Sequence, residues 1–441
     1  MRTAALQTLF DQAKDVLQGN WLGYATKPAP RLYPHQWSWD AAFIAIGYAH
    51  YDQARAQQEL RSLFRGQWAN GLLPHIVFNP QAAAYQPGPE FWQTARSPHA
   101  PREPQTSGIV QPPLHATAAW HVYQHSADPA EAIAFLREMF PKLCAWHAYL
   151  YRERDLRGDG LVYIRHPWES GQDNSPIWDR ALARIQLMPD QVPAYRRVDT
   201  AIVAVADRPT QAEYDRYAYL VQLAYANGYD ETRIRQVSPF LIEDVLFNAL
   251  LVQAGHDLAQ IALVLDENPA PFAAQAACTA AALNARLWDE EHAIYFDYDL
   301  VQKAPIHAHV AAGFSPLFAN VPTIKQATRM LDKLNQCGFC PLDEQCYAVP
   351  SYDKLEPGFA GHRYWRGPIW LNVNWLLYWG LRRYGFDDYA ARVKEAIIRL
   401  PQRYGFYEYF DPNTGRGHGS DRFSWSAALL IDLLSEGDEL V

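Results

Sequence analysis

The sequence predicts an all-α protein in which an inner and an outer ring of helices form an α/α toroid. Apolar residues recur at helical spacing along the 441 residues, and strand-like alternation is confined to short pieces. Residues 39–49 and 368–381 are apolar nearly all round, whereas residues 52–64 and 387–400 keep one polar face. A helix without a polar face is usually enclosed by other helices, so this alternation indicates two concentric rings.

The expected helices are, in chain order, 3–19, 39–50, 52–67, 112–126, 129–152, 212–228, 238–256, 270–287, 322–336, 368–385, 387–403 and 424–436. Asp128 stands where an N-cap is expected. Pro271 and Pro322 fit the first turn of a helix, where a proline costs no hydrogen bond. Short strands are expected only within Leu161–Ile164 and Ile294–Asp299. Helices therefore carry nearly all of the expected regular structure.

Three long irregular segments interrupt the helices, at about residues 69–111, 153–211 and 338–367. They are rich in Pro, Gly, Trp, Tyr and His, and no Pro/Ser-rich linker divides the chain. Long loops of this composition inside a compact fold are more often functional than disordered. We therefore expect a single domain over residues 1–441, with these three loops forming a cap over its site.

Composition limits the class of ligand. Aromatic residues make up 14% of the chain, with 15 Trp and 26 Tyr, a content typical of surfaces that stack on sugar rings. The formal net charge is -9 and the basic residues are scattered, which argues against nucleic acid or an anionic membrane as partner. Composition therefore favours a sugar.

The expected compartment is the cytoplasm. The first helical segment carries Asp11, Lys14 and Asp15 and lacks the apolar run of a signal peptide. No stretch approaches the ~20 apolar residues of a membrane span.

The five cysteines fit the same compartment, because an odd number in a large chain argues against a disulfide framework. Cys337, Cys340 and Cys346 lie close together in sequence, but a zinc site needs a fourth ligand and none stands nearby. We therefore expect reduced structural thiols, no metal and no other cofactor.

Asp173 is the leading candidate for a general acid. It lies in "HPWESGQDNSPIWD", residues 166–179, after a turn that directs it towards whatever Trp168 and Trp178 enclose. Apolar rings beside a carboxyl disfavour its charged form and raise its pKa, which suits a general acid at neutral pH. The alternative is that Asp173 caps the helical turn that follows it.

Glu408 is the second candidate carboxylate. It lies in "FYEYF", residues 406–410, whose alternation is typical of a short strand. One face of this strand would present Tyr407 and Tyr409, and the other would present Glu408 between two phenylalanines. A carboxylate on such a buried face either pairs with an arginine or takes part in a reaction.

Two further segments combine charges with aromatic rings. Asp40 lies at the start of a buried helix in "YPHQWSWDAAF", where the helix dipole alone would explain an acid but not the surrounding rings of Tyr33, Trp37 and Trp39. In "GHRYWRGPIWLNVNW", three aromatic residues surround Arg366 and favour a binding wall: Tyr364, Trp365 and Trp370. Carboxylates with stacking rings on a helical frame favour glycoside hydrolysis, with acid and base ~6.5 to 9.5 Å apart if inverting and ~5 to 5.5 Å apart if retaining.

Five segments together resemble glycoside hydrolase family 63, in particular its short bacterial members that hydrolyse glucosylglycerate and mannosylglycerate: "YPHQWSWDAAF", "TSGIVQPPLHA", "HPWESGQDNSPIWD", "YWRGPIW" and "FYEYFDP". The resemblance implies an (α/α)6 toroid, an inverting mechanism and no metal. It assigns the general acid to Asp173 and the general base to Glu408. Its sugar pocket would include Tyr33, Trp37, Asp40, Gln111, Trp168, Trp365 and Trp370.

The same resemblance bears on the leaving group. In the glycerate-releasing members a similar arginine and tyrosine hold the glycerate, and their counterparts here are Arg208 and Tyr214. A carboxylate on the leaving group gives the arginine a physical task. Tyr85 and Tyr364 resemble loop residues that close over the same group. The expected substrate is thus a compatible solute, glucosylglycerate or mannosylglycerate, and the choice between the two sugars stays open.

Other functions stay open as well. A trehalase or another α-glucosidase of the same fold would leave Arg208 without a task. A sugar epimerase would use two histidines, and candidate loops hold His35, His75, His307, His309 and His362. A non-catalytic carbohydrate-binding toroid would need only the aromatic residues. Loop aromatics would also permit contacts between subunits of a homo-oligomer.

Overall fold

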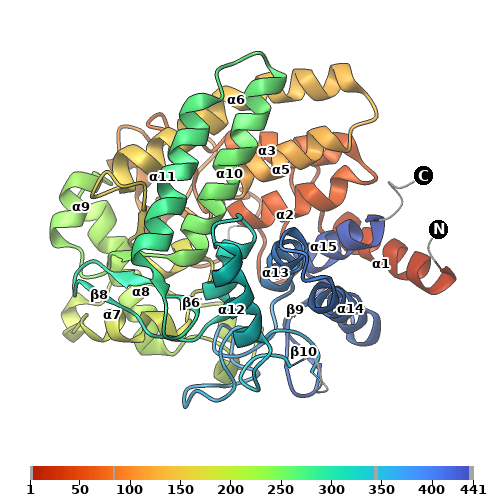
Figure 1. The fold of residues 1–441 in the computed structure, drawn as a ribbon. Coiled ribbons are helices and arrows are strands. Elements are labelled where there is room, and N and C mark those ends of the chain that lie inside the picture. Colours follow the sequence, from red (N-terminus) through yellow and green to blue (C-terminus); the bar gives the residue numbers. More distant parts are fainter. Residues whose placement is uncertain (1–2, 83–84, 342–345, 437–441) are drawn as a thin grey trace.

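Helices alternate along the chain between an inner and an outer ring in the computed structural model, which describes residues 3–82, 85–341 and 346–436 (Figure 1). The inner ring consists of α2 (Ser38–Ala49), α5 (His115–Gln124), α10 (Val245–Val264), η8 (Ala311–Leu317), α13 (Leu371–Arg383) and α15 (Ser424–Ser435). The outer ring consists of α1 (Ala4–Asn20), α3 (Gln53–Phe64), α6 (Pro129–Tyr149), α11 (Ala270–Arg286), α12 (Ile324–Leu334) and α14 (Asp387–Tyr404). Each inner helix follows an outer one.

The inner ring closes because each of its helices contacts the next in chain order and α15 contacts α2. Both α2 and α15 are buried over their whole length. They cross closely at Gly47, where a Cβ atom would clash with the backbone of Ala428, so this position needs glycine. Outer helices pack against the ring, for example α11 on α10 and α14 on α13 (Figure 1). The molecule is an all-α (α/α)6 toroid, as the sequence predicts.

All six inner helices begin at the same end of the toroid, because an outer helix returns the chain before each of them. The three longest connections precede inner helices. Residues 65–114 lead into α5, residues 150–244 lead into α10, and residues 335–341 and 346–370 lead towards α13. These segments therefore gather where the inner helices start, and we call them the cap.

Short elements build the cap and the remaining connections. Two-stranded antiparallel pairs are β1 (Gln36–Trp37) with β2 (Ile76–Val77), β5 (Trp288–Asp289) with β6 (Ile294–Tyr295), and β9 (Tyr407–Phe410) with β10 (Gly417–Asp421). A four-stranded sheet has the order β3 (Tyr163–Ile164), β4 (Ile242–Glu243), β7 (Tyr298–Asp299) and β8 (Ala304–Pro305). The cap also contains the helices α4 (Pro89–Trp92), α7 (Asp179–Ala183), α8 (Gln211–Ala226) and α9 (Glu231–Val237). Single turns lie at η1 (Thr94–Arg96), η2 (Leu150–Arg154), η3 (Pro167–Ser170), η4 (Pro176–Trp178), η5 (Pro189–Gln191), η6 (Asp199–Ala201) and η7 (Val205–Asp207).

Each expected helix is present, but the segment 238–256 is shifted. Its residues 242–243 form β4, and α10 begins only at Val245 because Asp244 accepts a hydrogen bond from the Phe247 N–H. The N-cap at Asp128 is confirmed. Pro322 does not lie in the first turn of α12, since Thr323 after it is the N-cap. Helix α9 was not predicted, because seven residues show too little periodicity.

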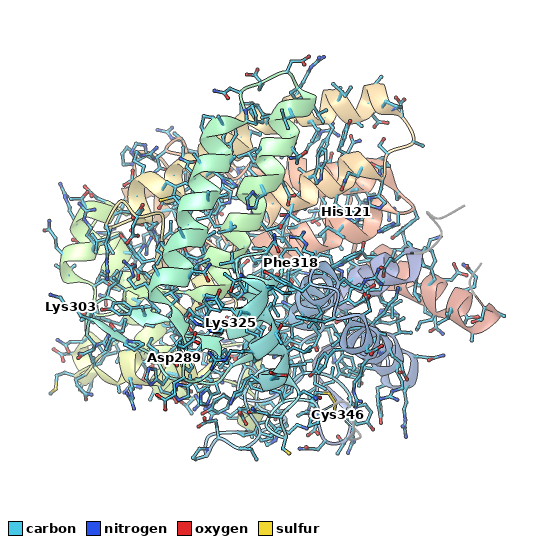
Figure 2. All side chains as sticks on the ribbon, viewed as in Figure 1. His121, Asp289, Lys303, Phe318, Lys325 and Cys346 are labelled. Carbon is cyan, nitrogen blue, oxygen red and sulfur yellow. A yellow bond between two sulfur atoms is a disulfide. The ribbon has the colours of Figure 1, made fainter. Side chains whose placement is uncertain are left out.

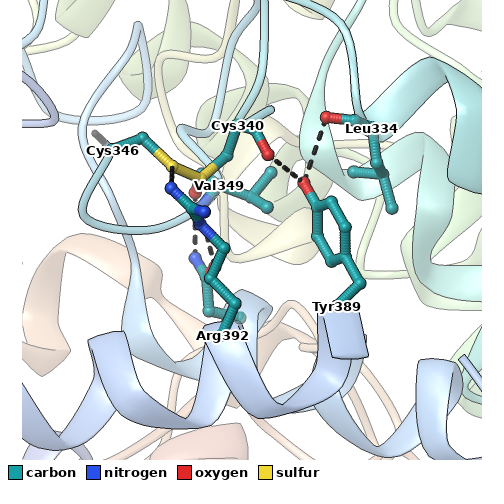
Figure 3. Close-up of a disulfide and its surroundings, with 7 residues drawn as sticks. Leu334, Cys340, Cys346, Val349, Tyr389 and Arg392 are labelled. Atoms are coloured by element: carbon teal, nitrogen blue, oxygen red, sulfur yellow. Dashed lines mark hydrogen bonds between the residues drawn. A yellow bond between two sulfur atoms is a disulfide. The ribbon is translucent and has the colours of Figure 1, made fainter. Parts of the chain in front are cut away.

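Cys340 and Cys346 form a disulfide (Figures 2 and 3), so the expectation of reduced thiols is wrong for this pair. Their Cα atoms lie 5.8 Å apart, inside the usual range for disulfides. Tyr389 on α14 donates its hydroxyl to the Cys340 carbonyl oxygen at 2.8 Å, and Arg392 donates to the Cys346 Sγ at 3.4 Å. An odd cysteine count excludes complete pairing, but it does not exclude one local bridge.

The inner helices are the most apolar part of the molecule. Helix α10, with 20 residues, is buried over most of its length, yet it includes the buried polar side chains Gln253 and Asp257. Among the described residues, no helix combines the length and the apolarity that crossing a bilayer requires. The apolarity of these helices reflects their enclosure by the outer ring.

Candidate active site

Asp173 lies in the cap segment before α10, just after η3. Gly171 has a φ of 71°, and a Cβ atom there would meet the ring of Trp39 on α2, so the turn needs glycine. Tyr217 on α8 donates its hydroxyl to the Asp173 carbonyl oxygen at 2.7 Å. These contacts hold the half-buried Asp173 side chain against the start of the inner ring. No side-chain cap bond is present at η4, where Ser175 is the N-cap, so Asp173 is not a cap.

Glu408 lies on β9, and its carboxylate is buried. Tyr33 donates its hydroxyl to Glu408 Oε1 at 2.7 Å, and the Ser420 N–H on β10 donates to Oε2 at 3.0 Å. The Arg208 guanidinium lies 3.9 Å from Oε1. The sequence left open whether Glu408 pairs with an arginine or takes part in a reaction. The carboxylate has an arginine partner and also lines a cavity, so the two roles are compatible.

The two carboxyls differ in the partners of their charged forms. Burial raises the pKa of Asp173 to about 7, which Arg208 opposes and Glu408 reinforces. Burial also raises the pKa of Glu408, but Arg208 and the hydrogen bonds from Tyr33 and Ser420 favour its ionised form. Asp173 therefore keeps its proton up to about neutral pH, while Glu408 has several partners for its charge. A general acid and a general base require this difference.

Asp40 is a third carboxyl in the same place. Burial raises its pKa well above the ordinary value, and the nearby Glu408 and Asp173 carboxyls raise it further. Burial and like charges therefore outweigh the backbone hydrogen bond that favours the charged form of Asp40. In its neutral form Asp40 can both donate to and accept from a sugar hydroxyl.

Two tyrosine hydroxyls connect the candidate acid to the candidate base. Tyr364 hydrogen-bonds the Asp173 carboxyl, and its hydroxyl lies 3.3 Å from that of Tyr33. Tyr33 in turn donates to Glu408. The Arg208 guanidinium lies 4.1 Å from the centre of the Tyr364 ring and donates to the Tyr33 hydroxyl at 3.1 Å. One network therefore orients both carboxyls.

The site consists of two adjoining cavities that share Tyr33, Trp37, Gln111 and Asp173. The first, which we call the carboxylate cavity, is also lined by Pro28, Trp39, Asp40, Gly171, Tyr364, Trp365, Glu408, Phe423 and Trp425. The second, which we call the arginine cavity, is also lined by His75, Ile76, Tyr85, Pro87, Trp92, Trp168, Arg208, Pro209 and Tyr214. A space with three carboxyls thus adjoins a space with a guanidinium.

Every predicted site residue except Trp370 lines one of these cavities. The Trp370 ring stacks on Trp365, with centroids 3.8 Å apart, and its indole N–H donates to the Tyr364 carbonyl oxygen at 3.0 Å. It therefore supports the wall from behind and lines neither cavity. Trp168, which was predicted beside the sugar, lines the arginine cavity.

Arg208 is buried and held by a second ion pair. Its Nε donates to Asp199 at 3.2 Å. Arg197 also donates to Asp199, at 3.0 and 2.7 Å, and lies over the Tyr214 ring. In the described residues Arg208 is the one arginine or lysine that lines either cavity. Its fixed position suits an anionic group in the arginine cavity.

Sequence reasoning missed Trp425 and Asp199, and it noted Trp39 beside Asp40 without placing it in the pocket. Trp39 and Trp425 line the carboxylate cavity from the first turns of α2 and α15. Both stand in a repeated Ser-Trp-x-Ala-Ala pattern, at residues 38–42 and 424–428, which could have revealed them. Asp199, the partner of Arg208, lies in an irregular loop with no local signal.

The histidines do not form an acid–base pair at this site. His75 lines the arginine cavity, and burial holds its pKa well below the ordinary value. His35 stacks beside Trp37 and lines neither cavity, and burial lowers its pKa to about 3. Of the histidines that the epimerase hypothesis named, only His75 is among the described cavity residues.

One cavity combines aromatic walls, a carboxyl that keeps its proton and a carboxylate whose charge has several partners. This combination defines the class of the protein as a glycoside hydrolase. The chain belongs to the family of the mannosylglycerate hydrolase MGH1-like glycoside hydrolase domain, whose model matches residues 33–426.

Individual relatives agree with this assignment. The chain is 53% identical to the mannosylglycerate hydrolase of Rubrobacter radiotolerans over 98% of both proteins, and 37% identical to the glucosylglycerate hydrolase of Mycolicibacterium hassiacum over 96% of this chain and 97% of that one. The GH63 mannosylglycerate hydrolase of Thermus thermophilus, solved with Tris and D-glycerate, superposes with a TM-score of 0.90 at 44% identity, covering 96% of this chain and 99% of that one. The resemblance to glycoside hydrolase family 63 is confirmed.

Proposed function

We propose that this protein is an inverting hydrolase of α-linked sugar glycerates, with mannosylglycerate preferred and glucosylglycerate as second substrate. The observation that carries the proposal is the adjacency of the two cavities, with Asp173 lining both. The sugar ring occupies the carboxylate cavity and the glycerate occupies the arginine cavity. The glycosidic oxygen then lies where the cavities meet, beside Asp173.

The reaction follows from this placement. Asp173 gives its proton to the glycosidic oxygen as the bond from that oxygen to the anomeric carbon breaks. Glu408 takes a proton from a water molecule, whose oxygen attacks the anomeric carbon from the opposite face. The products are the free sugar with inverted anomeric configuration and glycerate, and a later proton exchange resets both carboxyls.

An inverting rather than retaining course is supported by the hydrogen-bonded chain between the carboxyls. Two hydroxyls, of Tyr364 and Tyr33, connect Asp173 to Glu408. A gap that two hydroxyl groups bridge is compatible with the ~6.5 to 9.5 Å of inverting enzymes, the course that the family 63 resemblance implies.

Glycerate as leaving group is supported by the buried Arg208 in the arginine cavity and by the D-glycerate complex of the Thermus thermophilus relative. The guanidinium fork matches a carboxylate, and the hydroxyls of Tyr85 and Tyr214 line the same space. The order of identities, higher for the mannosylglycerate hydrolase, favours mannose over glucose.

Proton NMR of the purified protein tests the proposal directly, with mannosylglycerate, glucosylglycerate and trehalose in separate tubes. We expect the β-anomer of the free sugar to appear first from the α-linked glycerates, before mutarotation mixes the anomers. Initial release of the α-anomer would contradict the inverting course. Cleavage of trehalose alone would contradict the glycerate assignment, and epimerisation without cleavage would contradict hydrolysis.

The pH profile should show an alkaline limb set by Asp173. Its pKa of about 7 means that the proton needed for catalysis is lost as the pH rises through this value, so kcat/KM should fall above about pH 7. The acidic limb should follow Glu408, whose pKa lies above the ordinary value, as protonation removes the base. Initial rates between pH 4 and 10 measure both limbs, and a flat profile from about pH 6 to 9 would contradict Asp173 as acid.

Replacing Arg208 with lysine should selectively lower activity on substrates that release glycerate. Lysine cannot form the fork to a carboxylate, and charge-assisted hydrogen bonds contribute about 1.5–3 kcal/mol, so kcat/KM for mannosylglycerate should fall by about 10- to 150-fold. The kcat/KM for a glycosyl fluoride, which has no carboxylate, should fall much less. Arg196→Lys, at an exposed position of the same loop, is the control and should behave like wild type. Equal losses on both substrates would limit Arg208 to supporting Glu408.

The remaining proposals concern the whole protein. We infer one catalytic domain over residues 1–441, with the loops at about 69–111, 153–211 and 338–367 as its cap, and a cytoplasmic role in the turnover of a compatible solute. The cytoplasmic assignment is opposed by the Cys340–Cys346 disulfide, since such bridges are rare in reducing compartments. Cell fractionation decides between the compartments. Sedimentation measures whether the protein forms a homo-oligomer.

A further inference from the structure

A third cavity, of about 350 Å³, lies towards the opposite end of the toroid, between the last turns of α2, α5, α13 and α15 and the middle of α10. Figure 2 labels two residues that line it, His121 on α5 and Phe318 just after η8. Three carboxyl groups line it, from Asp257, Asp432 and Glu436, against one guanidinium, from Arg383. The catalytic carboxyls Asp173 and Glu408 lie near the other ends of these helices, so the proposed reaction makes no use of this space.

Four potential metal ligands converge at its wall from three inner helices. His50 directly follows α2, and Asp432 lies on α15. His121 lies in the last turn of α5, and His125 directly follows that helix. The Nε2 atoms of His50 and His121 lie 2.8 and 3.2 Å from the same oxygen, Asp432 Oδ1. These two nitrogens are 3.2 Å from each other. Ring nitrogens of all three histidines lie within 4.8 Å of one another.

Hydrogen atoms alone accommodate these three contacts only with crowding. If both histidines donate Nε2–H to Asp432 Oδ1, which can accept both, the two donor nitrogens lie only 3.2 Å apart. If one histidine instead accepts from the other, one of the two contacts with the carboxylate loses its proton. A cation between the three atoms satisfies all of them. With bonds of about 2.0–2.1 Å, the corners of a tetrahedral zinc site lie about 3.3 Å apart, close to the contacts observed.

Surrounding groups already orient the ligands as in metal sites. Trp375 donates its indole N–H to Asp432 Oδ2 at 2.7 Å, which leaves Oδ1 directed at the histidines. His125 Nδ1 lies 2.8 Å from the His121 carbonyl oxygen. A histidine that donates one ring N–H to a backbone carbonyl binds a metal through its other nitrogen.

We propose that His50, His121, His125 and Asp432 form a binding site for Zn²⁺ at the end of the toroid opposite the catalytic site. Three imidazoles and one carboxylate favour zinc over magnesium or calcium, which prefer oxygen ligands. The three histidines lie within 4.8 Å of one another and Asp432 approaches two of them, so binding draws Asp432 in as the fourth ligand and makes the ion structural. It ties the ends of α2, α5 and α15 together, including the α2–α15 contact that closes the ring.

Zinc content tests the proposal on the full chain without a polyhistidine tag. The protein is stripped with a chelator, loaded with ZnCl2, freed of excess metal and analysed by mass spectrometry of the elements. We expect about one zinc ion per chain in the wild type and less than about 0.1 in His125→Ala. His125 is the first position to change because His121→Ala would also remove a partner of the buried Asp432.

A second group of neighbouring histidines provides the control. His292, His307 and His309 lie together on another part of the surface, and His307 is exposed. His307→Ala should keep its zinc. Zinc retained in His125→Ala but lost in His307→Ala would overturn the assignment, as would a wild type that binds no zinc in a ZnCl2 titration.

Thermal unfolding separates metal binding from an ordinary packing role. Zinc should raise the melting temperature of the wild type by about 2 °C or more and leave that of His125→Ala unchanged. In excess chelator the two proteins should melt together. If His125→Ala melts lower than wild type by the same amount with and without zinc, the histidine only packs, and the proposal fails. Hydrolase activity of the chelated proteins reports that each one is folded.

Discussion

Replacing Glu408 with glutamine is expected to lower kcat for mannosylglycerate by about 10³-fold or more. Glutamine has nearly the same shape but cannot take a proton from water. The Ser420 N–H and the Tyr33 hydroxyl remain beside the new side chain, so the cavity should keep its form. Initial rates with saturating substrate, together with a melting curve, measure the effect and confirm that the variant is folded.

A matched control comes from the same hairpin. Asp421 lies on β10 with about half of its side chain exposed, and it faces Arg31 rather than the cavity. Asp421→Asn removes one negative charge from the neighbourhood of Glu408, yet it should leave kcat within a factor of about 2, because exposed ion pairs contribute little. If both variants lost activity alike, the loss would reflect charge or stability rather than a missing base.

Azide makes the test of Glu408 sharper. In Glu408→Ala, the shortened side chain leaves space on the face from which water attacks, and azide is a nucleophile that needs no base. Azide should therefore restore turnover and yield the β-glycosyl azide from an α-linked substrate. A product of α configuration would contradict attack from the Glu408 side.

The toroid could be predicted well from the sequence because the helices of its inner and outer rings differ in the hydrophobicity of their residues. Helices α2 and α15 are buried on all sides and are apolar on all sides, whereas α14 has one polar face, so burial can be read directly from the pattern. The start of α10 was predicted wrongly because apolar residues 240–242 suit a buried strand as well as a helix. Only the pairing of β4 with β3 and β7 decides between these possibilities.

Within the candidate site, residues with unusual local surroundings could be predicted, and residues defined by distant partners could not. Asp173 and Glu408 stand out because acids among aromatic rings are rare along a chain. Asp199 has no such surroundings, and its role follows only from its contact with Arg208. Trp370 does have unusual local surroundings, yet it lies behind Trp365. A sequence pattern cannot distinguish a residue that faces the cavity from one that packs behind the cavity wall.

The histidines at the far end of the toroid illustrate the same limit. His121 and His125 are four residues apart on α5, a spacing that places two ligands on one face of a helix and that could have been noticed. His50 and Asp432 are far from them in sequence and join them only when the ring closes. The disulfide differs, because its two cysteines are only six residues apart and the rule on odd cysteine counts concealed it.

Replacing Asp173 with asparagine should lower kcat for mannosylglycerate by about 10³-fold, because the amide cannot protonate the leaving oxygen. Asparagine resembles the protonated acid in shape and charge. Since the pKa of Asp173 is about 7, the wild-type side chain is already largely neutral below that pH, and the substitution should disturb the site little. Asp190→Asn, an exposed position in the same cap segment, should retain full activity.

A substrate whose leaving group needs no proton tests whether Asp173 acts as the general acid. Fluoride departs without a proton, so α-mannosyl fluoride should be hydrolysed by Asp173→Asn with a loss of only about 10-fold or less, while Glu408→Gln should be impaired on both substrates. The alkaline limb of the pH profile should also disappear for the fluoride in Asp173→Asn, because no proton is then required from the enzyme. If Asp173→Asn were equally slow on the fluoride and on mannosylglycerate, Asp173 would hold the sugar rather than protonate its leaving group. The two variants should respond differently to the fluoride because Asp173 gives a proton to the leaving group, whereas Glu408 takes a proton from the attacking water.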